Sequence, residues 1–466
     1  MEPLAFTAAD VAAATGGRVV EGDSALRIGR VSIDSRTVGA GDFFVAIHGE
    51  RFDGHAFVAD AVGRGATGVM VHQQVAPQAG GAATVVQVDD TTRGLQDVAR
   101  DVRRRSGAKV VAITGSAGKT TTKEITAEFL EARYRVFRNK GNLNNHIGLP
   151  LSLMELRARP EAAVVELGMN HPGEIRTLVG VAEPEVRVWT NVGDAHLGFF
   201  ASADAIAEAK AEILEHARPT DVLVANADDP RVMTHARRFA GRTVTFGVER
   251  DADVRATHVE CRGLEGTAAT VRTASGDLEI ETRLLGGGNL SNVLAATAVA
   301  LEFGVPTSAI RERAARLRPA HHRGELLRLP GGVTVIDDSY NSSPSALKRS
   351  LETVRAATGS ARKAAVLGEM LELGDHAIRL HQECGRAAAD AGLAILIAVG
   401  GAPARALADA AIAAGMPAEG VAAVSTKEEA ADVALRRIRP GDLVLVKGSR
   451  GIGTDFVVER LKVEFA

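Results

Sequence analysis

The sequence predicts an α/β protein of three domains. At a prior of about 150 residues per domain, a chain of 466 residues suggests three. From residue 109 onwards, short apolar runs alternate with amphipathic segments, as parallel strands alternate with the helices that join them. The alternation starts afresh after Pro319, so we place the domains at residues 1–107, 108–319 and 320–466.

Short apolar runs define the strands expected in each domain. In the first they lie between glycine-rich turns at 30–33, 42–47, 68–71 and 84–88, followed by a polar helix at 97–105. In the second they lie at 110–114, 163–167, 186–192, 222–225 and 243–248. In the third they lie at 333–336, 364–367, 394–399, 421–424 and 443–446.

These strand patterns predict a different kind of sheet in different parts of the chain. The first domain is a small α/β unit. The second is a mainly parallel sheet covered on both faces, to which residues 253–285 add antiparallel hairpins at one edge, because polar and apolar residues alternate there. The third is a second doubly wound, Rossmann-like domain.

Composition narrows the class of protein. The net charge of -3 gives no electrostatic reason to expect nucleic acid or a membrane as a partner, and no apolar run approaches the ~18 residues that a membrane span needs. The N-terminus lacks a basic-then-apolar signal segment, and only Cys261 and Cys384 occur, too few for a disulfide framework. We therefore expect a cytoplasmic enzyme.

A phosphate-binding loop is the strongest single motif. Residues 110–122 read Val-Val-Ala-Ile-Thr-Gly-Ser-Ala-Gly-Lys-Thr-Thr-Thr, an apolar strand that passes through a glycine loop into a helix. Gly115 and Gly118 let backbone N–H groups approach phosphate oxygens, Lys119 adds a full charge, and Thr120 can bind magnesium. The loop is shorter than the common form. A plain turn explains the glycines but not a cation at a helix start, so we expect ATP or GTP to bind.

Polar residues at the ends of two central strands form a candidate metal site. Glu166 ends the strand at 163–167, and His196 follows the strand at 186–192. Ligands of open parallel sheets bind beyond the carboxyl ends of the strands, where a carboxylate and an imidazole could hold magnesium. Each residue also has a simpler interpretation, Glu166 as a helix cap and His196 as an ordinary loop histidine.

Lys210 occupies an unusual place on a predicted helix at 202–214. It lies on the apolar stripe of Ile206 and Ile213, whereas Glu212 faces elsewhere. A lysine that extends its amine to solvent is the simpler interpretation, and the spacing alone does not overturn it.

Three further segments could contact a nucleotide or an anion. The segment 288–292, Gly-Asn-Leu-Ser-Asn, precedes an apolar helix and could cap it or bind a base edge. Asp337 and Asp338 end a strand, where they could bind a ribose hydroxyl or open a turn, and Arg323 before them is a candidate phosphate contact. The loop 447–451, Lys-Gly-Ser-Arg-Gly, could bind an anion or be only a turn.

Taken together and in this order, the motifs resemble the Mur ligase family along essentially the whole chain. The residues that carry the resemblance are 32–36, 52–55, 114–121, 141–150, Glu166, His196, 209–213, Asn292, 337–341 and 447–451. The resemblance implies a UDP-sugar-binding first domain, a central ATP-binding domain and a C-terminal domain that closes over the site. It implies an ATP-dependent ligase that joins D-alanyl-D-alanine to UDP-N-acetylmuramoyl-tripeptide through an acyl phosphate, in peptidoglycan precursor synthesis, acting as a monomer.

The resemblance also assigns the site residues. Catalysis falls to Lys119, His196 and Lys210, with Lys210 carbamylated. ATP binding falls to Gly115, Ser116, Ala117, Gly118, Lys119, Thr120, Thr121, Asn292, Arg323 and Asp338. Two Mg²⁺ ions would be held by Thr120, Glu166, His196 and Lys210. The UDP substrate would contact Ser35, Arg36, Gly54 and His55, and the dipeptide Asn341 and Ser343.

Several residues depart from the family pattern. Ala117 stands where the loop commonly has Asn, and His322 precedes Arg323 where Gly is usual. Ser342 and Ser343 replace Ala and Asn after Tyr-Asn, and Asp455 replaces a usual Glu. Two alternative functions stay open: a sister ligase that adds a single amino acid to a muramoyl peptide or a folate, and a nucleotide-dependent switch or binding module.

Overall fold

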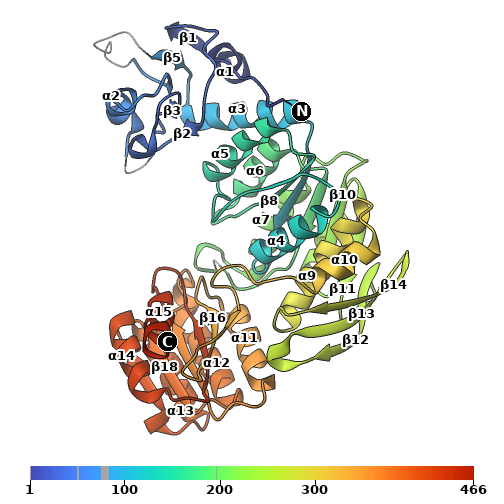
Figure 1. Ribbon diagram of the computed structural model, residues 1–466, viewed down its shortest axis with the longest axis vertical. Coiled ribbons are helices and arrows are strands. Elements are labelled where there is room, and N and C mark those ends of the chain that lie inside the picture. The colour runs from blue at the N-terminus through green and yellow to red at the C-terminus, as the bar shows by residue number, and fades with distance from the viewer. Residues whose placement is uncertain (1, 50–51, 75–82, 196) are drawn as a thin grey trace. The chain divides into compact units, whose positions relative to one another are not determined.

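The computed structural model describes residues 2–49, 52–74, 83–195 and 197–466, and these residues form three sheets (Figure 1). The sheets have five, nine and six strands. The chain falls into two compact units, one of Met1–Ala112, Arg133–Arg187 and Glu212–Asp221, the other of Ile113–Ala132, Val188–Ala211 and Val222–Ala466.

The five-stranded sheet belongs to the first region and has the order β1-β5-β4-β3-β2. Its strands are β1 (Arg18–Glu21), β2 (Val31–Ser32), β3 (Phe43–Val45), β4 (Gly68–Val71) and β5 (Thr84–Gln87). All neighbours are parallel except β1 and β5. Its helices are α1 (Ala8–Thr15), α2 (Val58–Gly63) and α3 (Thr91–Ser106). An apolar core that includes Phe44, Val58 and Val69 joins α2 to one face of the sheet.

The nine-stranded sheet has the order β14-β13-β12-β11-β10-β9-β6-β8-β7. Its parallel part comprises β6 (Lys109–Thr114), β7 (Val136–Arg138), β8 (Ala162–Glu166), β9 (Val186–Trp189), β10 (Val222–Asn226) and β11 (Arg242–Gly247). The helices between and after these strands are α4 (Lys119–Leu130), α5 (Gly148–Leu153), α6 (Glu174–Ala182), α7 (Ala203–Ala211), α8 (Pro230–Ala236), α9 (Gly287–Glu302) and α10 (Thr307–Ala314). Strands β8, β9 and β10 are buried along their whole length. This is expected for continuous apolar runs in a sheet whose two faces are both covered by helices.

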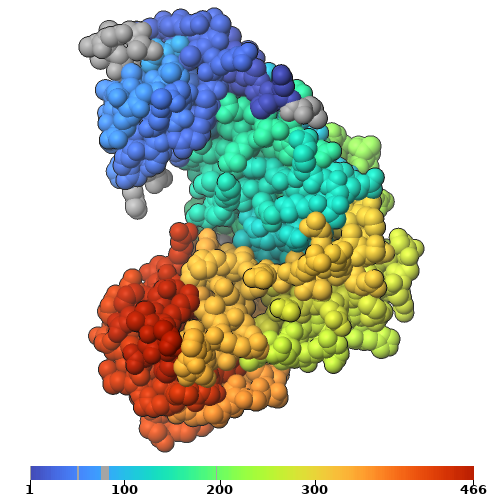
Figure 2. Space-filling model, in the orientation of Figure 1, coloured from blue at the N-terminus to red at the C-terminus, as the bar shows by residue number. Residues whose placement is uncertain are grey.

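Antiparallel strands extend one edge of this sheet, as the sequence predicts. They are β12 (Val254–Cys261), β13 (Thr267–Thr273) and β14 (Gly276–Thr282), with β12 parallel to β11 and then antiparallel to β13. Along β14 buried and exposed residues alternate, so one face of the strands meets solvent (Figure 2). Figure 2 shows this segment in yellow-green at the surface.

The six-stranded sheet of the third region has the order β15-β16-β20-β17-β18-β19. Its strands are β15 (Glu325–Arg328), β16 (Thr334–Asp338), β17 (Lys363–Gly368), β18 (Ile395–Val399), β19 (Val421–Val424) and β20 (Leu443–Lys447). Its helices are α11 (Pro344–Ala356), α12 (Ala377–Asp390), α13 (Ala402–Ala413), α14 (Lys427–Arg437) and α15 (Asp455–Glu464). Only β15 is antiparallel to its neighbour, and α14 and α15 pack on one face over an aliphatic core. This arrangement is the doubly wound sheet that the sequence predicts.

Three strands are absent from the sequence prediction, and each is short or at an edge. β1, β7 and β15 lie at or beside the rim of their sheets and carry half-buried or exposed residues, so none presents an apolar run. One helix start is also wrong in the prediction. Residues 288–292 do not precede the apolar helix, because α9 begins at Gly287 and includes them.

The structure also bears on two expectations from the sequence, which concern membrane-spanning helices and the two cysteines. In the described ranges no helix is both long and apolar enough to cross a bilayer. Cys261 is exposed, Cys384 is buried, and both are free thiols. Burial raises the pKa of the Cys384 thiol to about 12, so this group is packed as a small apolar side chain.

Candidate active site

The backbone of the phosphate loop requires glycine at two positions. Gly115 has a φ of +149° and Gly118 a φ of +81°, values that side chains disfavour. A Cβ atom would overlap Thr190 Oγ1 at the first position and Asn292 Oδ1 at the second. The two glycines therefore allow the loop to pass close to both of these polar side chains, as the sequence motif predicts.

The end of β9 holds the loop in place. Asn191 Oδ1 accepts a hydrogen bond from the Ala117 N–H (2.9 Å), and Asn191 Nδ2 donates to the Ala117 carbonyl (3.0 Å). Thr190 Oγ1 donates to the same carbonyl at 2.7 Å. Sequence analysis missed both residues as parts of the site. The signal that could have found them is a Thr-Asn pair at the carboxyl end of a buried strand, which becomes informative only once β9 is known to lie beside β6.

Helix α4 begins at Lys119, directly after the loop, with Gly118 as its N-cap in the left-handed conformation. Thr120 and Thr121 therefore lie in the first turn, where backbone N–H groups point out of the helix. The Lys119 ammonium donates to the Gly115 carbonyl at 2.7 Å, so its charge is held against the loop. The helix start carries a cation where the helix dipole alone would favour an anion, an arrangement that suits a bound phosphate.

Asn292 connects the loop to α9. Its Oδ1 accepts a hydrogen bond from Thr122 Oγ1 (3.2 Å), and its Nδ2 donates to Asn289 Oδ1 (3.2 Å). The side chain is largely buried. Asn292 thus joins the early part of α9, where it is the sixth residue, to Thr122 in the first turns of α4.

Lys210 is buried in α7, with only 2% of its surface exposed. This burial excludes the interpretation that its amine extends to solvent. Burial, and secondarily the charge of Lys119, hold the pKa of Lys210 well below that of an ordinary lysine. In the described part of the chain no carboxylate pairs with it. The buried amine of Lys210 therefore lies within electrostatic reach of Lys119, the lysine of the phosphate loop.

The magnesium ligands proposed from the sequence are described only in part. Glu166 ends β8 and is buried; its Oε1 accepts a hydrogen bond from Asn144 Nδ2 (2.8 Å), and its N–H donates to Asn139 Oδ1 (3.0 Å). His196 lies outside the described residues. Among the residues described, no three or more His, Cys, Asp or Glu side chains form a metal-binding group. A magnesium ion that bridges nucleotide phosphates needs few protein ligands, so the magnesium site stays a prediction from the sequence.

Glu212 corrects one detail of the sequence analysis. Its carboxylate does not face away from the protein but is buried and accepts hydrogen bonds from the N–H groups of Gly173 (2.6 Å) and Arg176 (3.0 Å). These N–H groups lie at the start of α6, so Glu212 caps that helix from a distant part of the sequence.

The carboxyl ends of β16 and β20 bring several of the predicted third-domain residues together. Asp338 Oδ2 accepts hydrogen bonds from the Lys447 ammonium (2.7 Å) and from Ser350 Oγ (2.8 Å). Lys447 also donates to the Asn341 carbonyl at 3.0 Å. Ser343 is the N-cap residue of α11 and makes no side-chain cap bond. The Arg323 guanidinium lies over the Tyr340 ring, 4.2 Å from its centroid.

The predicted UDP contacts lie on two short 3₁₀ turns of the first region, both packed against α2. On the first turn Ser35 is buried, whereas the Arg36 side chain is exposed and forms a two-bond pair with Asp34. Gly54 and His55 lie on the second. The His55 ring is buried, with Nδ1 2.6 Å from Asp53 Oδ1 and with Nε2 accepting from the His72 N–H (3.1 Å).

These contacts determine the role that His55 can play. Nε2 needs a lone pair to accept from a backbone N–H, so Nδ1 carries the proton and donates to Asp53. Hydrogen bonds from His55 hold the pKa of Asp53 at about 2. Both ring nitrogens are therefore engaged inside the protein, and the ring shapes the turn instead of presenting a free nitrogen to substrate.

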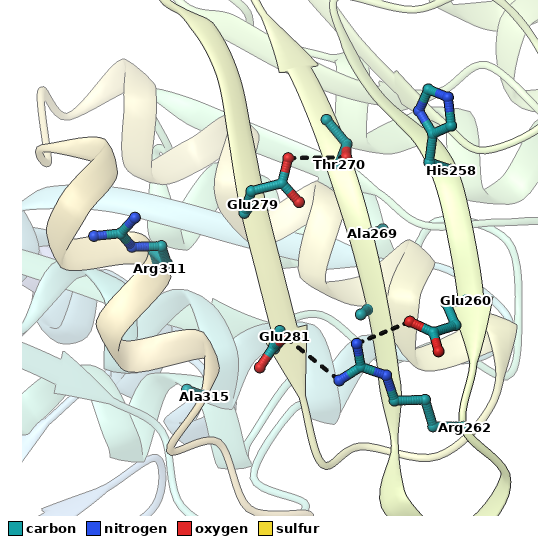
Figure 3. A pocket seen from close by; sticks show the side chains of 10 residues that line it. His258, Glu260, Arg262, Ala269, Thr270, Glu279, Glu281, Arg311 and Ala315 are labelled. Carbon is teal, nitrogen blue, oxygen red and sulfur yellow. Dashed lines mark hydrogen bonds and ion pairs between the residues drawn. The ribbon is translucent and has the colours of Figure 1, made fainter.

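A pocket of about 400 Å³ lies on the antiparallel edge strands and is lined by none of the predicted site residues (Figure 3). Its three carboxylates have partners within the pocket: Arg262 pairs with Glu260 (2.8 Å) and Glu281 (3.4 Å), and Thr270 donates to Glu279 (2.9 Å). We regard it as a solvated surface of the hairpins and place the candidate site at the phosphate loop.

The chain matches models of known protein families. Three family models match in order: "Mur ligase family, catalytic domain" at residues 27–103, "Mur ligase middle domain" at 113–300 and "Mur ligase, glutamate ligase domain" at 322–450. A UDP-N-acetylmuramoyl-tripeptide–D-alanyl-D-alanine ligase of Bacillus subtilis is 33% identical over 92% of each chain. The chain belongs to the Mur ligase family. The predicted resemblance is thereby confirmed.

Solved structures of the family agree with the fold. MurF from Acinetobacter baumannii superposes with a TM-score of 0.89 at 30% identity, covering 99% of this chain and 100% of that one. A MurF ligase from Thermotoga maritima in complex with ADP gives a TM-score of 0.82 at 30% identity, covering 94% and 97%. The three-domain α/β architecture is therefore confirmed, whereas the domain boundaries stay predictions.

Proposed function

We propose that this protein is an ATP-dependent, ADP-forming ligase that joins D-alanyl-D-alanine to UDP-N-acetylmuramoyl-tripeptide. One observation carries the proposal: relatives named for this reaction match over nearly the full length of both chains. The phosphate loop, with its close-packed glycines and Lys119 at the start of α4, supplies the nucleotide site that such a reaction needs.

The proposed reaction has two steps. A carboxylate oxygen of the tripeptide attacks the γ-phosphorus of ATP, and ADP leaves, which gives an acyl phosphate. The amine of D-alanyl-D-alanine then attacks the acyl carbon, inorganic phosphate leaves, and the nitrogen loses a proton. The protein's part is to position the reactants and to stabilise charge on the transferring phosphoryl group.

Each set of residues has a role in these steps. We assign the triphosphate to residues 115–121, with Lys119 stabilising the charge that develops as the γ-phosphoryl group moves. Asn292 would contact adenine, Asp338 the ribose and Arg323 a phosphate. Ser35, Arg36, Gly54 and His55 would form the UDP-substrate site, with His55 shaping its turn, and Asn341 and Ser343 would contact the dipeptide.

We further propose that two Mg²⁺ ions take part, held by Thr120, Glu166, His196 and a carbamylated Lys210. Bound magnesium would supply positive charge beside the phosphates. Lys210 suits the modification because its low pKa favours the neutral amine, the form that reacts with carbon dioxide. The carbamate would replace this neutral amine with an anion beside Lys119. The proposal keeps the cytoplasmic location and the monomeric state expected from the sequence.

Substrate choice tests this function. A site that pairs the internal amide and far carboxylate of a dipeptide leaves buried polar groups unpaired when a single amino acid binds, at ~1–3 kcal/mol for each group. With ATP and UDP-N-acetylmuramoyl-tripeptide present, we expect D-alanyl-D-alanine to trigger ADP release, and D-alanine, L-lysine and diaminopimelate to give almost none.

The same assay separates the alternatives. Efficient addition of a free diamino acid to a muramoyl dipeptide would replace this proposal with the sister ligase. Slow ATP hydrolysis at the same rate with every acceptor, and no amide product, would indicate a nucleotide-dependent switch.

A further inference from the structure

We propose that His322 is a positioning residue for the nucleotide: its bond to the buried carboxylate of Asp337 fixes Arg323 and Asp338 in the arrangement that binds ATP. This inference rests on the proposed function, which assigns a phosphate to Arg323 and the ribose to Asp338. It concerns only residues of the third region, described as one part of the same compact unit.

The backbone of His322 is in an uncommon conformation. Its φ is +59°, in the left-handed region where glycine is at ease and a residue with a Cβ atom is disfavoured. Such a residue persists only where the surrounding contacts hold it. The contacts that hold His322 in this conformation therefore indicate its role.

One contact is made by the side chain. His322 Nδ1 lies 2.7 Å from Asp337 Oδ2, and the Asp337 carboxylate has no exposed surface. The other carboxylate oxygen, Oδ1, accepts hydrogen bonds from Ser339 Oγ (2.5 Å) and from the Ser339 N–H (3.2 Å). In the described ranges no other hydrogen bond reaches Oδ2. Without the imidazole, this buried oxygen would lose its partner, a costly loss for a charged group.

Two backbone bonds flank the same place. The Tyr340 N–H donates to the His322 carbonyl (3.1 Å), and the Gly324 N–H donates to the Asp337 carbonyl (2.9 Å). Arg323 lies between His322 and Gly324, so its backbone is tied on both sides to the end of β16. Its guanidinium is thereby placed over the Tyr340 ring.

The side-chain bond and the backbone bonds act on one short segment. His322 anchors Asp337, and Asp337 is the neighbour of Asp338, whose carboxylate holds Lys447 at 2.7 Å. Loss of the imidazole should loosen the end of β16 and move both the Arg323 guanidinium and the Asp338 carboxylate. A residue that merely stabilised the fold would lower stability without changing nucleotide affinity in particular.

The test is a double-mutant cycle on ATP and ADP binding, measured by calorimetry without peptide substrates. We expect His322→Gly to weaken ATP binding about tenfold, the scale of one lost hydrogen bond to a charged group, while the ease with which glycine adopts this backbone offsets part of the stability lost with that bond. His322→Asn, which tolerates the conformation and keeps an N–H donor, should recover part of the affinity. His321→Gly is the matched control: its exposed ring stacks on His322, and it should bind as wild type does.

Arg323→Ala closes the cycle. Because His322 acts partly through Arg323 and partly through Asp338, the loss of ATP affinity in the double variant should be clearly smaller than the sum of the two single losses. Wild-type affinity in His322→Gly, fully additive losses, or a His322→Gly protein that fails to fold would each overturn the inference. The proposed function fails by a different result, a wild-type protein that forms no amide product, so the two outcomes are distinguishable.

Discussion

Lys119→Ala is expected to reduce ATP-dependent ligation by roughly a hundredfold to a thousandfold, the usual effect of removing a group that stabilises charge in the transition state. Lys119 lies at the start of α4 with its ammonium 2.7 Å from the Gly115 carbonyl, so its charge is fixed against the phosphate loop. The measurement is ADP release with all three substrates present. Binding of the UDP-linked tripeptide should be largely unchanged, because the proposal assigns it to the first region.

Lys109→Ala is the matched control for this variant. Lys109 is exposed at the opposite end of β6, the strand that leads into the loop, and its removal should leave turnover unchanged. ADP production at the wild-type rate by Lys119→Ala would show that residues 115–121 do not form the phosphate site.

Lys210→Ala should also abolish ligation, and small added carboxylates should restore part of the activity. The physical reason is that a carbamate presents two oxygens where the buried amine stands, and an added carboxylate can replace those oxygens once the side chain is shortened. Carbon-13 NMR of the wild-type protein in labelled bicarbonate provides a direct readout, since a carbamate carbon should appear and be lost in the variant.

Lys210→Arg separates the carbamate from a plain cation at the same place. Arginine keeps the positive charge but is not expected to form the carbamate, so this variant should be inactive, and added carboxylates should not rescue it because the cavity is filled. A Lys210→Arg protein with wild-type activity would contradict the carbamate and make Lys210 a simple cationic residue.

The parts of the site that sequence predicts best are those whose signal is local. The phosphate loop is one continuous segment, and the inward position of Lys210 follows from helical spacing with Ile206 and Ile213, all three of which are buried. Helical spacing alone could not show whether the Lys210 amine reaches solvent or is buried. Its burial became clear only from the packing of α7, and the carbamate was suggested by the family resemblance.

The contacts that sequence missed join residues distant along the chain. Thr190 and Asn191 bind the loop because the sheet places β9 beside β6, 70 or more residues away along the chain. Glu212 caps α6 for the same kind of reason. His322 is a third example: its departure from the family pattern is visible in the sequence, but its bond to Asp337 appears only when β15 pairs with β16.

The three strands that were not predicted from the sequence were missed for the same reason. β1, β7 and β15 are short and carry exposed or half-buried residues, so hydrophobic periodicity gives no signal for them. The central strands, buried on both faces, were predicted to within a few residues. The buried strands were therefore enough to predict the fold class, whereas the strands at the sheet edges became visible only in the structure.

The transfer of oxygen from substrate to phosphate tests the central claim most directly. The tripeptide carboxylate is labelled with heavy oxygen and incubated with ATP, D-alanyl-D-alanine and the wild-type protein, and mass spectrometry follows the label and the amide product. The proposed ligase predicts equal amounts of ADP and amide, with one labelled oxygen in each inorganic phosphate released, because the carboxylate oxygen stays on phosphorus when the amine displaces it. Unlabelled phosphate, or ADP formed without an amide, would contradict the account.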